Sequence, residues 1–550
     1  MSATFWAFVP AIIAILLALA TKQVYVSLFA GIFVGAMFLS KGDPVRALGD
    51  IFTVMSEKIG GNGGILIFLV MLGILVALIT KSGGSYAYGN WACTKIKSRR
   101  GAMLATSGLG ALIFVDDYFN CLTVGNVMRP VTDKYKVSRA KLAYIIDSTA
   151  APICIIAPIS SWAAAVAGEI EGDGLIMFIK TIPFNLYALL TLAMVIVVCC
   201  SGKFDFFKMK KNEKAALKGD LLNGETDLPT EDTVDIEVKS GGKVAYLVIP
   251  ILVLVLSCVG SMMYVGFFYD WDAGALGTVV QSANVAEAFA NCDAGLSLAI
   301  GSSIAVIFTL IYYMAAKVLN FKSIAESFTQ GFKSMVPAIL ILTLAWTLSG
   351  IMGAKGGYLD ARGFVQKTIT ADSMALGVIP AVLFLCAALI SFSTGTSWGT
   401  FGILIPIATA VLGTQATTST LMAVSAVLAG AVYGDHVSPI SDTTILASSG
   451  AQCNHVDHVK TQLPYATLVA SLCFIGYLIT GFIAQTDMSY GVLALVTILI
   501  GFAFLTLSLV TVYFMEKAKD KKTPAIETAA PAVVTVNAEP ENGESCENKD

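Results

Sequence analysis

The sequence predicts an all-α membrane protein built from two inverted repeats, each with a re-entrant hairpin and a broken transmembrane helix, plus an extra C-terminal helix. Three observations lead to this fold class: the composition, a series of apolar stretches of membrane-spanning length, and short segments that occur twice in the same order. Hydrophobic residues make up 56% of the 550 residues, charged residues only 13%, and mean hydropathy is +0.77. Soluble domains are roughly 45–50% apolar and about 25% charged, so the lipid bilayer is the expected solvent.

Predominantly apolar stretches long enough to cross a hydrocarbon core of roughly 30 Å recur along the chain. Nine of them are expected to be spanning helices: 5–20, 24–39, 65–80, 175–200, 244–268, 294–316, 334–352, 463–486 and 490–515. The first has no Lys or Arg before it, so it lacks the basic start of a cleavable signal peptide. Regions 101–168 and 374–452 are also apolar, but Gly, Pro, Ser, Thr and Asp interrupt them. These two regions are expected to contain the re-entrant hairpins and the broken helices.

The distribution of Lys and Arg predicts which loops face the cytoplasm. Basic residues collect in loops 81–100, 129–141 and 317–333, whereas loops 168–174 and 269–293 contain none. Because short cytoplasmic loops are enriched in Lys and Arg, the first three loops are expected inside and the other two outside. The C-terminus is then cytoplasmic. The net charge of -3 provides no general basic field, so nucleic acid is not an expected partner.

Two hydrophilic segments set the expected domain boundaries. Segment 201–243 contains seventeen charged residues and is predicted to be a solvated cytoplasmic linker between the two halves. The segment after Met515 is rich in Pro, Glu, Asn and Ala, which favours disorder. The expected domains are an N-terminal membrane repeat at 1–200, the linker at 201–243, a C-terminal membrane repeat at 244–486, an extra transmembrane helix at 487–515 and a disordered cytoplasmic tail at 516–550.

Three pairs of similar segments indicate an internal duplication. Lys81–Tyr86 and Lys355–Tyr358 both contain a Gly-Gly pair followed by Tyr. The remaining pairs are Ala111–Asp117 with Ala388–Thr394, and Ala157–Ser161 with Ser438–Asp442. Their order and spacing are nearly the same in both halves, which is typical of a repeat. Inverted repeats with interrupted helices near the midplane are the architecture of secondary transporters.

The two interrupted regions contain five carboxylates: Asp116, Asp117, Asp147, Asp435 and Asp442. An Asp at the centre of a membrane helix costs roughly 2.5–3.5 kcal/mol, so such residues persist where a cavity, an ion or a partner compensates. All five are candidate ion- or substrate-binding residues, and Asp435 and Asp442 are the candidate Na+ ligands. The alternative is that some of them cap half-helices, a position that Asp favours.

Hydroxyl groups accompany the carboxylates at the same breaks. Hydroxyls, freed carbonyls and carboxylates are the oxygen ligands that small cations prefer. The candidate neutral ligands are Ser160, Ser393, Thr394, Ser441 and Thr443. His455 and His458 are interpreted as part of a cytoplasmic loop that responds to pH, in preference to a metal site, because their spacing does not match a zinc motif.

The segment Tyr433–Leu446, which reads Tyr-Gly-Asp-His-Val-Ser-Pro-Ile-Ser-Asp-Thr-Thr-Ile-Leu, is followed by Asp457–Tyr465. Together they resemble the signature of the NhaC-type Na+/H+ antiporter family, and Phe114–Tyr118 with Asp147–Pro152 is similar to the same family. The resemblance covers about residues 5–515, without the linker or the tail. It implies a multi-pass secondary transporter of a bacterial plasma (inner) membrane, whose hairpins and broken helices move in an elevator-like manner. Members of this family also exchange organic acids or carry amino acids with Na+.

Removing a carboxylate from water disfavours its charged form, so the same oxygens can hold either a proton or Na+. Competition at one site and alternating access are sufficient for exchange, with no covalent step and no cofactor. The leading hypothesis is Na+/H+ antiport, with Na+ and H+ as the transported or coupling ions. The alternative is Na+- or H+-coupled transport of an amino acid or organic acid, whose anionic group lies at half-helix N-termini. A membrane enzyme or receptor is disfavoured, because no nucleophile–base set or signalling domain is found. Homodimer formation is left open.

Overall fold

The computed structural model describes residues 4–522 except 22, 171–173, 225–241, 271–274, 279, 283–287, 289–291, 354–358, 361–373, 414 and 487. Much of the predicted outer loops, the second Gly-Gly segment and the tail beyond Lys522 therefore lie outside the described residues. The chain divides into two compact units, Met1–Thr506 and Leu507–Asp550. Helix α23 (Tyr490–Lys522) belongs partly to each, and the remaining described elements belong to the first unit.

The described residues are almost entirely helical, which confirms the predicted all-α class. Strand structure among them is limited to β1 (Tyr269–Asp270) and β2 (Ala275–Leu276), which pair antiparallel. Among the described residues, eight helices are long and apolar enough to cross a membrane, and the number is up to ten if each bent helix pair is one span. The eight are α4 (Gly63–Lys81), α13 (Ala245–Phe268), α15 (Ala294–Ala315), α16 (Phe321–Met352), α18 (Ile379–Thr394), α20 (Thr418–Val437), α22 (His455–Ile483) and α23.

The bent pairs occur in the N-terminal half. Helix α2 (Val24–Leu39) is followed by α3 (Pro44–Gly61) at an angle of 114°. Helix α10 (Gly174–Thr181), extended by the 3-10 turn Ile182–Phe184, is followed by α11 (Leu186–Cys200) at 50°. The break before α11 lies beside Pro183, which has no backbone N–H to donate a hydrogen bond to the preceding turn.

Helices α4, α15 and α16 pack closely because glycines face one another at their crossings. A Cβ atom on Gly73 of α4 would lie 2.3 Å from the backbone oxygen of Gly331 on α16. A Cβ atom on Gly64 would lie 2.4 Å from the backbone carbonyl carbon of Gly295 on α15. Small residues allow helix backbones to approach in the bilayer, where van der Waals packing drives association. Helices α1 (Val9–Thr21), α2 and α3 share a buried apolar cluster with α16.

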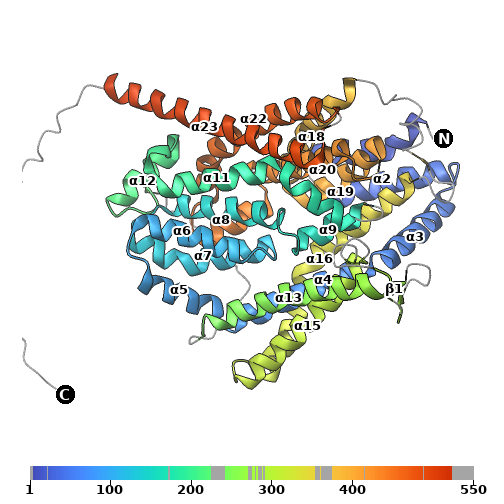
Figure 1. The fold of residues 1–550 in the computed structure, drawn as a ribbon, viewed down its shortest axis with the longest axis horizontal. Helices are drawn as coiled ribbons and strands as arrows, with labels where there is room; N and C mark the ends of the chain where they lie inside the picture. Colours follow the sequence, from blue (N-terminus) through green and yellow to red (C-terminus); the bar gives the residue numbers. More distant parts are fainter. Residues whose placement is uncertain are drawn as a thin grey trace, which may run out of the picture. The chain divides into compact units, whose positions relative to one another are not determined.

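The interrupted regions each form two helices joined by a short tip, followed by a helix that breaks in its middle. In the first half these helices are α6 (Arg99–Leu112), α7 (Asp117–Lys134), α8 (Arg139–Cys154) and α9 (Ser161–Glu169). In the second half they are α18, α19 (Ser397–Leu412), α20 and α21 (Asp442–Ala451). Helix α6 packs on α8 as α18 packs on α20, and α7 packs on α21 as α19 packs on α9. Figure 1 shows α6 beside α8 and α18 beside α20. The inverted orientation of the halves stays a prediction.

Three helices were not expected from the sequence: α3, α5 (Gly84–Lys95) and α12 (Phe207–Leu217). Helix α12 lies in the segment expected to be a solvated linker, yet it packs on α8 and α22 and buries Met209, Asn212 and Glu213. The first part of this segment is therefore an ordered element of the membrane unit. Its remaining residues, 225–241, are outside the described part of the chain.

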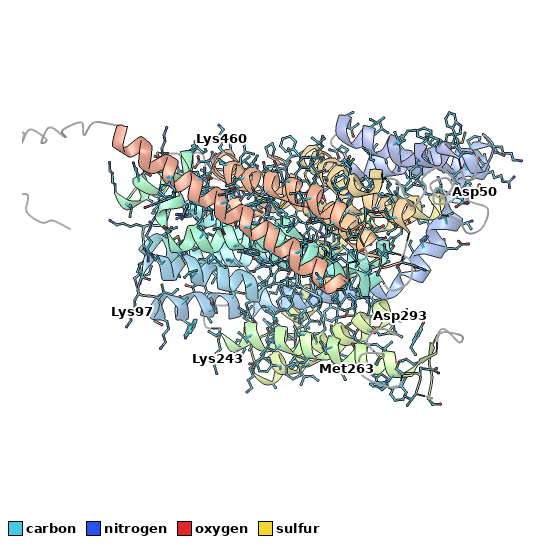
Figure 2. All side chains as sticks on the ribbon, turned by 45° about the horizontal axis from the view of Figure 1, so that its top comes forward. Asp50, Lys97, Lys243, Met263, Asp293 and Lys460 are labelled. Carbon is cyan, nitrogen blue, oxygen red and sulfur yellow. The ribbon has the colours of Figure 1, made fainter. Side chains whose placement is uncertain are left out.

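The charged residues labelled in Figure 2 are separated by sign along the helices of the first unit. Figure 2 shows Lys97, Lys243 and Lys460 toward one end of the helices of the first unit, and Asp50 and Asp293 toward the other. This separation agrees with the loop charges on which the predicted orientation rests. The orientation in the membrane remains a prediction.

Candidate functional site

Within each half, the tip of the hairpin is hydrogen-bonded to the start of the second part of the broken helix. In the first half, the backbone N–H of Ser161 donates to the backbone oxygen of Val115 at 2.9 Å. In the second half, the N–H of Asp442 donates to the oxygen of Gly395 at 3.4 Å. Gly395 has φ +68° and carries no Cβ, which lets the backbone approach Ile440. The start of α7 is thereby held beside that of α9, and the start of α19 beside that of α21.

Side chains connect the two pairs of helix starts across the halves. The hydroxyl of Tyr118, in the first turn of α7, donates to Oδ2 of Asp442 at 3.4 Å. The rings of Trp162 and Trp398, in the first turns of α9 and α19, are 5.9 Å apart. The starts of α7, α9, α19 and α21 therefore surround one place, which we call the four-helix site. Helix N-termini carry partial positive charge, so this place is electrostatically unusual for the interior of a membrane protein.

Three buried carboxylates lie at the four-helix site. Asp116 is 2% exposed and caps α7 by accepting the N–H of Phe119 at 2.9 Å. Asp117 is 1% exposed, and Asp435 at the end of α20 is 3% exposed. Asp117 interacts electrostatically with both of the others. Three like charges in a buried cluster repel one another unless a cation or protons are present.

Donors satisfy these carboxylates incompletely. The hydroxyl of Ser397 donates to Oδ2 of Asp435 at 2.9 Å. The Oδ1 atoms of Asp117 and Asp435 accept no hydrogen bond of normal geometry from the described residues. Trp162 faces Asp117, and Ser441 faces Asp435. An unmet acceptor of this kind costs about 1–3 kcal/mol, more when it is charged, so a bound cation or proton would stabilise the site.

Asp442 differs from the other three acids because it is exposed, and unlike Asp116 it does not cap its helix. The cap of α21 is Ser441, whose Oγ accepts the N–H of Thr444 at 3.2 Å. Asp442 is the first residue of α21 and is classed among the exposed residues. Asp442 is therefore not the N-cap of α21, and the alternative that it only caps this helix does not apply. Thr443 is buried, with its hydroxyl 3.2 Å from that of Ser441.

The other expected hydroxyl ligands are engaged in local structure. Ser160 caps α9 by accepting the N–H of Ala163 at 3.1 Å, and it donates to the oxygen of Cys154 at 2.7 Å. Thr394 donates to the oxygen of Ile390 at 2.9 Å, within α18. Ser393 is partly buried in the last turn of α18. Ser397, three residues further along the same hydroxyl-rich stretch, makes the contact with Asp435 and was not singled out from the sequence.

A sequence model of the Na+/H+ antiporter family matches residues 163–482, more than half of the chain. The chain belongs to the Na+/H+ antiporter family. An uncharacterized protein of Haemophilus influenzae is 40% identical to this antiporter, and the match covers 94% of the antiporter and 96% of the Haemophilus protein. The malate-2H+/Na+-lactate antiporter of Bacillus subtilis is 30% identical, and the match covers 30% of this chain and 34% of that protein. The arginine/ornithine antiporter of Halobacterium salinarum is 36% identical over 20% of this chain and 23% of that protein.

Family membership confirms the resemblance inferred from Tyr433–Leu446 and makes this protein a multi-pass membrane transporter of the antiport class. The family consists of antiporters and not of enzymes. The matched region contains the starts of α19 and α21 completely, and it begins just inside α9. The first hairpin, with Asp116 and Asp117, lies before it.

Asp147 belongs to a separate buried network in this antiporter. Its Oδ2 accepts from Gln462 at 2.6 Å, from Thr444 at 3.1 Å and from His458 at 3.3 Å. The ring of His436 lies 3.0 Å from the backbone oxygen of Asp147. These residues come from α8, α20, α21 and α22, so the network joins four helices. Asp147 itself is completely buried.

The structure corrects the interpretation of the histidines as loop residues. Helix α22 begins at His455, and His458 is buried in its first turn against Asp147. His455 contacts Ser448 and the backbone oxygen of Pro439, which belong to the second broken helix. Within the described ranges, no three His, Cys, Asp or Glu side chains are grouped to hold a metal ion. A transported Na+ would therefore need hydroxyl and carbonyl oxygens beside carboxylates.

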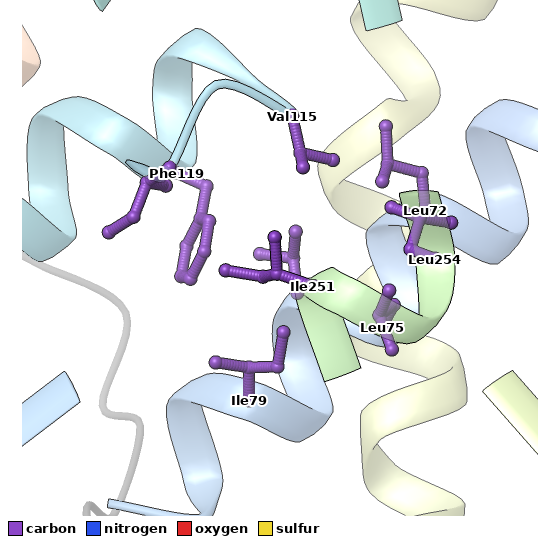
Figure 3. A pocket seen from close by; sticks show the side chains of 9 residues that line it. Leu72, Leu75, Ile79, Val115, Phe119, Ile251 and Leu254 are labelled. Carbon is purple, nitrogen blue, oxygen red and sulfur yellow. The ribbon is translucent and has the colours of Figure 1, made fainter. Parts of the chain in front are cut away.

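A small pocket lies against the tip of the first hairpin and is lined by apolar side chains alone. Figure 3 shows Val115 and Phe119 on one side and side chains of α4 and α13 on the other. The residues lining it are Leu72, Leu75, Val76, Ile79, Ile113, Val115, Phe119, Ile251 and Leu254. Because it offers an ion no polar ligand, it is a packing gap between the hairpin tip and the neighbouring spanning helices and not an ion site.

Proposed function

We propose that this antiporter exchanges Na+ for H+ at the four-helix site. The observation that carries the proposal is that Asp117 and Asp435 each have one buried oxygen that accepts no hydrogen bond of normal geometry from the described residues, at a place where a third carboxylate adds repulsion. Either a proton or Na+ on these oxygens compensates the missing hydrogen bonds and reduces the repulsion between the carboxylates. Both cannot occupy the same oxygens, so binding of one displaces the other.

The residues of the site have different roles in this proposal. Asp117 and Asp435 hold the transported cation or the proton. Asp116 is committed to the cap of α7 and keeps the chain before Asp117 in place. Ser397 and Thr443 supply neutral oxygens, and the exposed Asp442 receives the cation from solvent. Two of the helix starts belong to the hairpins, so a movement of the hairpins against α4 and α16 would carry the ion from one side to the other.

The test is Na+-driven proton flux in proteoliposomes containing the purified full-length protein. Replacing Asp117 or Asp435 by Asn keeps size and hydrogen bonding but removes a charged ligand, which costs about 3 kcal/mol, or roughly 100-fold in apparent Na+ affinity. Asp133→Asn is the matched control, because Asp133 lies at the other end of α7 in an ion pair with Arg139. Near-normal flux in Asp117→Asn and Asp435→Asn proteins of normal stability would contradict the proposal.

A second candidate is coupled exchange of an amino acid or organic acid at the same site. The cap residue of α19, Thr396, makes no side-chain hydrogen bond to the first turn, unlike the cap residues of α7, α9 and α21. A helix start without a side-chain cap suits a substrate carboxylate, and two of the relatives are named for organic or amino acid exchange. The same liposomes, offered Na+ alone or with a panel of these acids, distinguish the candidates. Proton flux that requires an acid favours the second.

A further inference from the structure

A fourth buried carboxylate lies at the far end of α9 and has no role in the four-helix site. Glu169 is the last residue of α9 and is 4% exposed. Neither of its oxygens has a hydrogen-bond partner among the residues that the structure describes. In the sequence Glu169 belongs to the acidic segment 168–174, which was expected to be a loop, but in the structure its side chain is buried. A carboxylate in this position is retained at a cost of several kcal/mol unless an ion or proton compensates.

Glu169 lies where α9 meets α19 and α16. A Cβ atom on Gly402 of α19 would lie 2.9 Å from the Cβ atom of Ala345 on α16 and 3.6 Å from Oε1 of Glu169, so the glycine lets α19 pack closely on α16 beside this oxygen. On α16, the ring of Trp346 lies against Gly168, and its indole N–H is buried without a hydrogen-bond partner. The positive charge of Lys58 on α3 partly compensates Glu169, so a cation bound by Glu169 has to compete with this lysine. The groups around Glu169 thus come from both the interrupted regions and the closely packed spanning helices.

Helix α9 joins Glu169 directly to the four-helix site. Eight steps of 1.5 Å separate its first residue, Ser161, from Glu169, which is about 12 Å along the helix axis. The end of α9 that carries Glu169 leads into segment 168–174, which the loop charges place on the outer side. An ion passing from that side to the four-helix site along α9 would meet Glu169 first.

We propose that Glu169 forms a second binding site for a monovalent cation, between the outer side and the four-helix site. The inference rests on the proposed exchange of Na+ at the four-helix site. A cation held by Glu169 is close enough to enter the central site when the central carboxylates release a proton. Removing Glu169 should therefore weaken Na+ binding from the outer side and leave the central site intact.

The test is equilibrium binding of radioactive Na+ to purified protein, with choline chloride keeping the ionic strength constant. Glu169→Gln should reduce the Na+ bound per chain by roughly half, and Asp435→Asn should remove the other half, because each site contributes one ion. Glu326→Gln is the matched control, since Glu326 is half exposed and paired with Lys81, and it should bind as the wild type does.

The outcomes for the two sites can be told apart. Unchanged Na+ binding in a Glu169→Gln protein that unfolds at the wild-type temperature overturns this inference, whatever Asp435→Asn does. Unchanged binding in Asp435→Asn with a loss in Glu169→Gln contradicts the proposed central site alone. In sided liposomes, Glu169→Gln should raise the half-saturating Na+ concentration about 10-fold from the outer side and much less from the inner side. Equal effects from both sides also overturn the inference.

Discussion

Replacement of Lys141 by Met should destabilise the protein far more at about pH 8 than at about pH 5. Lys141, in the first turn of α8, is completely buried, and its Nζ lies 2.6 Å from Asp205 and 2.9 Å from Glu213. Glu213 also pairs with Arg99 and accepts the N–H of Ser138 at 2.9 Å. Removing the lysine therefore leaves Glu213 partly compensated, whereas Asp205 loses its closest cation.

The pH dependence follows from Asp205. Burial raises the pKa of its carboxyl to about 6, even though Lys141 acts in the opposite direction. Burial also acts to raise the pKa of Glu213, but Lys141 and Arg99 outweigh it, and the pKa of Glu213 is lowered. Without Lys141 the pKa of Asp205 should rise further. Each further pKa unit by which Asp205 rises destabilises the folded state by about 1.4 kcal/mol at a pH above the new pKa. At a pH well below 6 the rise has no effect, because Asp205 is protonated in both proteins.

The expected size of the effect comes from the loss of one partner of a buried ion pair, which costs about 3–5 kcal/mol. Because Glu213 keeps Arg99, we expect about 3 kcal/mol at pH 8 for Lys141→Met. At pH 5, where Asp205 is protonated in both proteins, the difference should shrink by about 1.4–2.8 kcal/mol.

Thermal unfolding of detergent-purified protein at both pH values measures the effect. The double variant Lys141→Met/Asp205→Asn should regain most of the lost stability at pH 8, because no unpaired charge remains. The reasoning is refuted by an equal loss of stability at both pH values, or by a double variant no more stable than Lys141→Met.

Four further predictions concern other parts of the molecule. Asp442→Asn should fold normally, because Ser441 supplies the helix cap, and should lose exchange, which flux in liposomes measures. Gly125→Ala should lower the unfolding temperature and slow exchange, because its Cβ atom would lie 2.5 Å from the backbone of Gly450 and overpacking costs about 1–3 kcal/mol. Gly108→Ala is the control, because a Cβ atom on Gly108 would have nothing within 4 Å. Gln462→Leu removes the 2.6 Å donor to Asp147 and should cost about 1–3 kcal/mol in unfolding measurements. Truncation after Lys522 should leave transport unchanged, because the removed tail has too little apolar content to pack.

The sequence predicted the hairpins and breaks because the residues that produce them act locally. Pro158 and Pro439 follow the first parts of the broken helices within a few residues, and the hydroxyl residues two positions after each Pro cap the second parts. The network around Asp147 could not be predicted in the same way. Asp147 lies inside α8, and its partners come from residues about 300 positions further along the chain. The sequence of α8, which is buried on all sides, gives no indication of which neighbour Asp147 contacts.

Glu169 and α12 show the limits of arguments from composition. An acidic segment with three carboxylates in seven residues, 168–174, predicts solvent exposure, and a segment with seventeen charges predicts a solvated linker. In both cases part of the segment is buried: Glu169 beside α19, and Glu213 between Lys141 and Arg99. Composition averages over a segment, whereas burial is decided by which face of a single turn meets a neighbouring helix.

The four helix starts also show why the roles of neighbouring acids could not be separated from the sequence. Each start has a cap residue followed by the first helical residue, and the first helical residues are Asp117, Ser161, Ser397 and Asp442. The acids among them come from the hairpin of the first half and from the broken helix of the second, so the two halves contribute unlike residues to matching positions. A shift of one residue separates Asp116, which is used as a cap, from Asp117, whose Oδ1 accepts no hydrogen bond. Cap geometry, and not residue type, therefore decides which carboxylate is available to an ion.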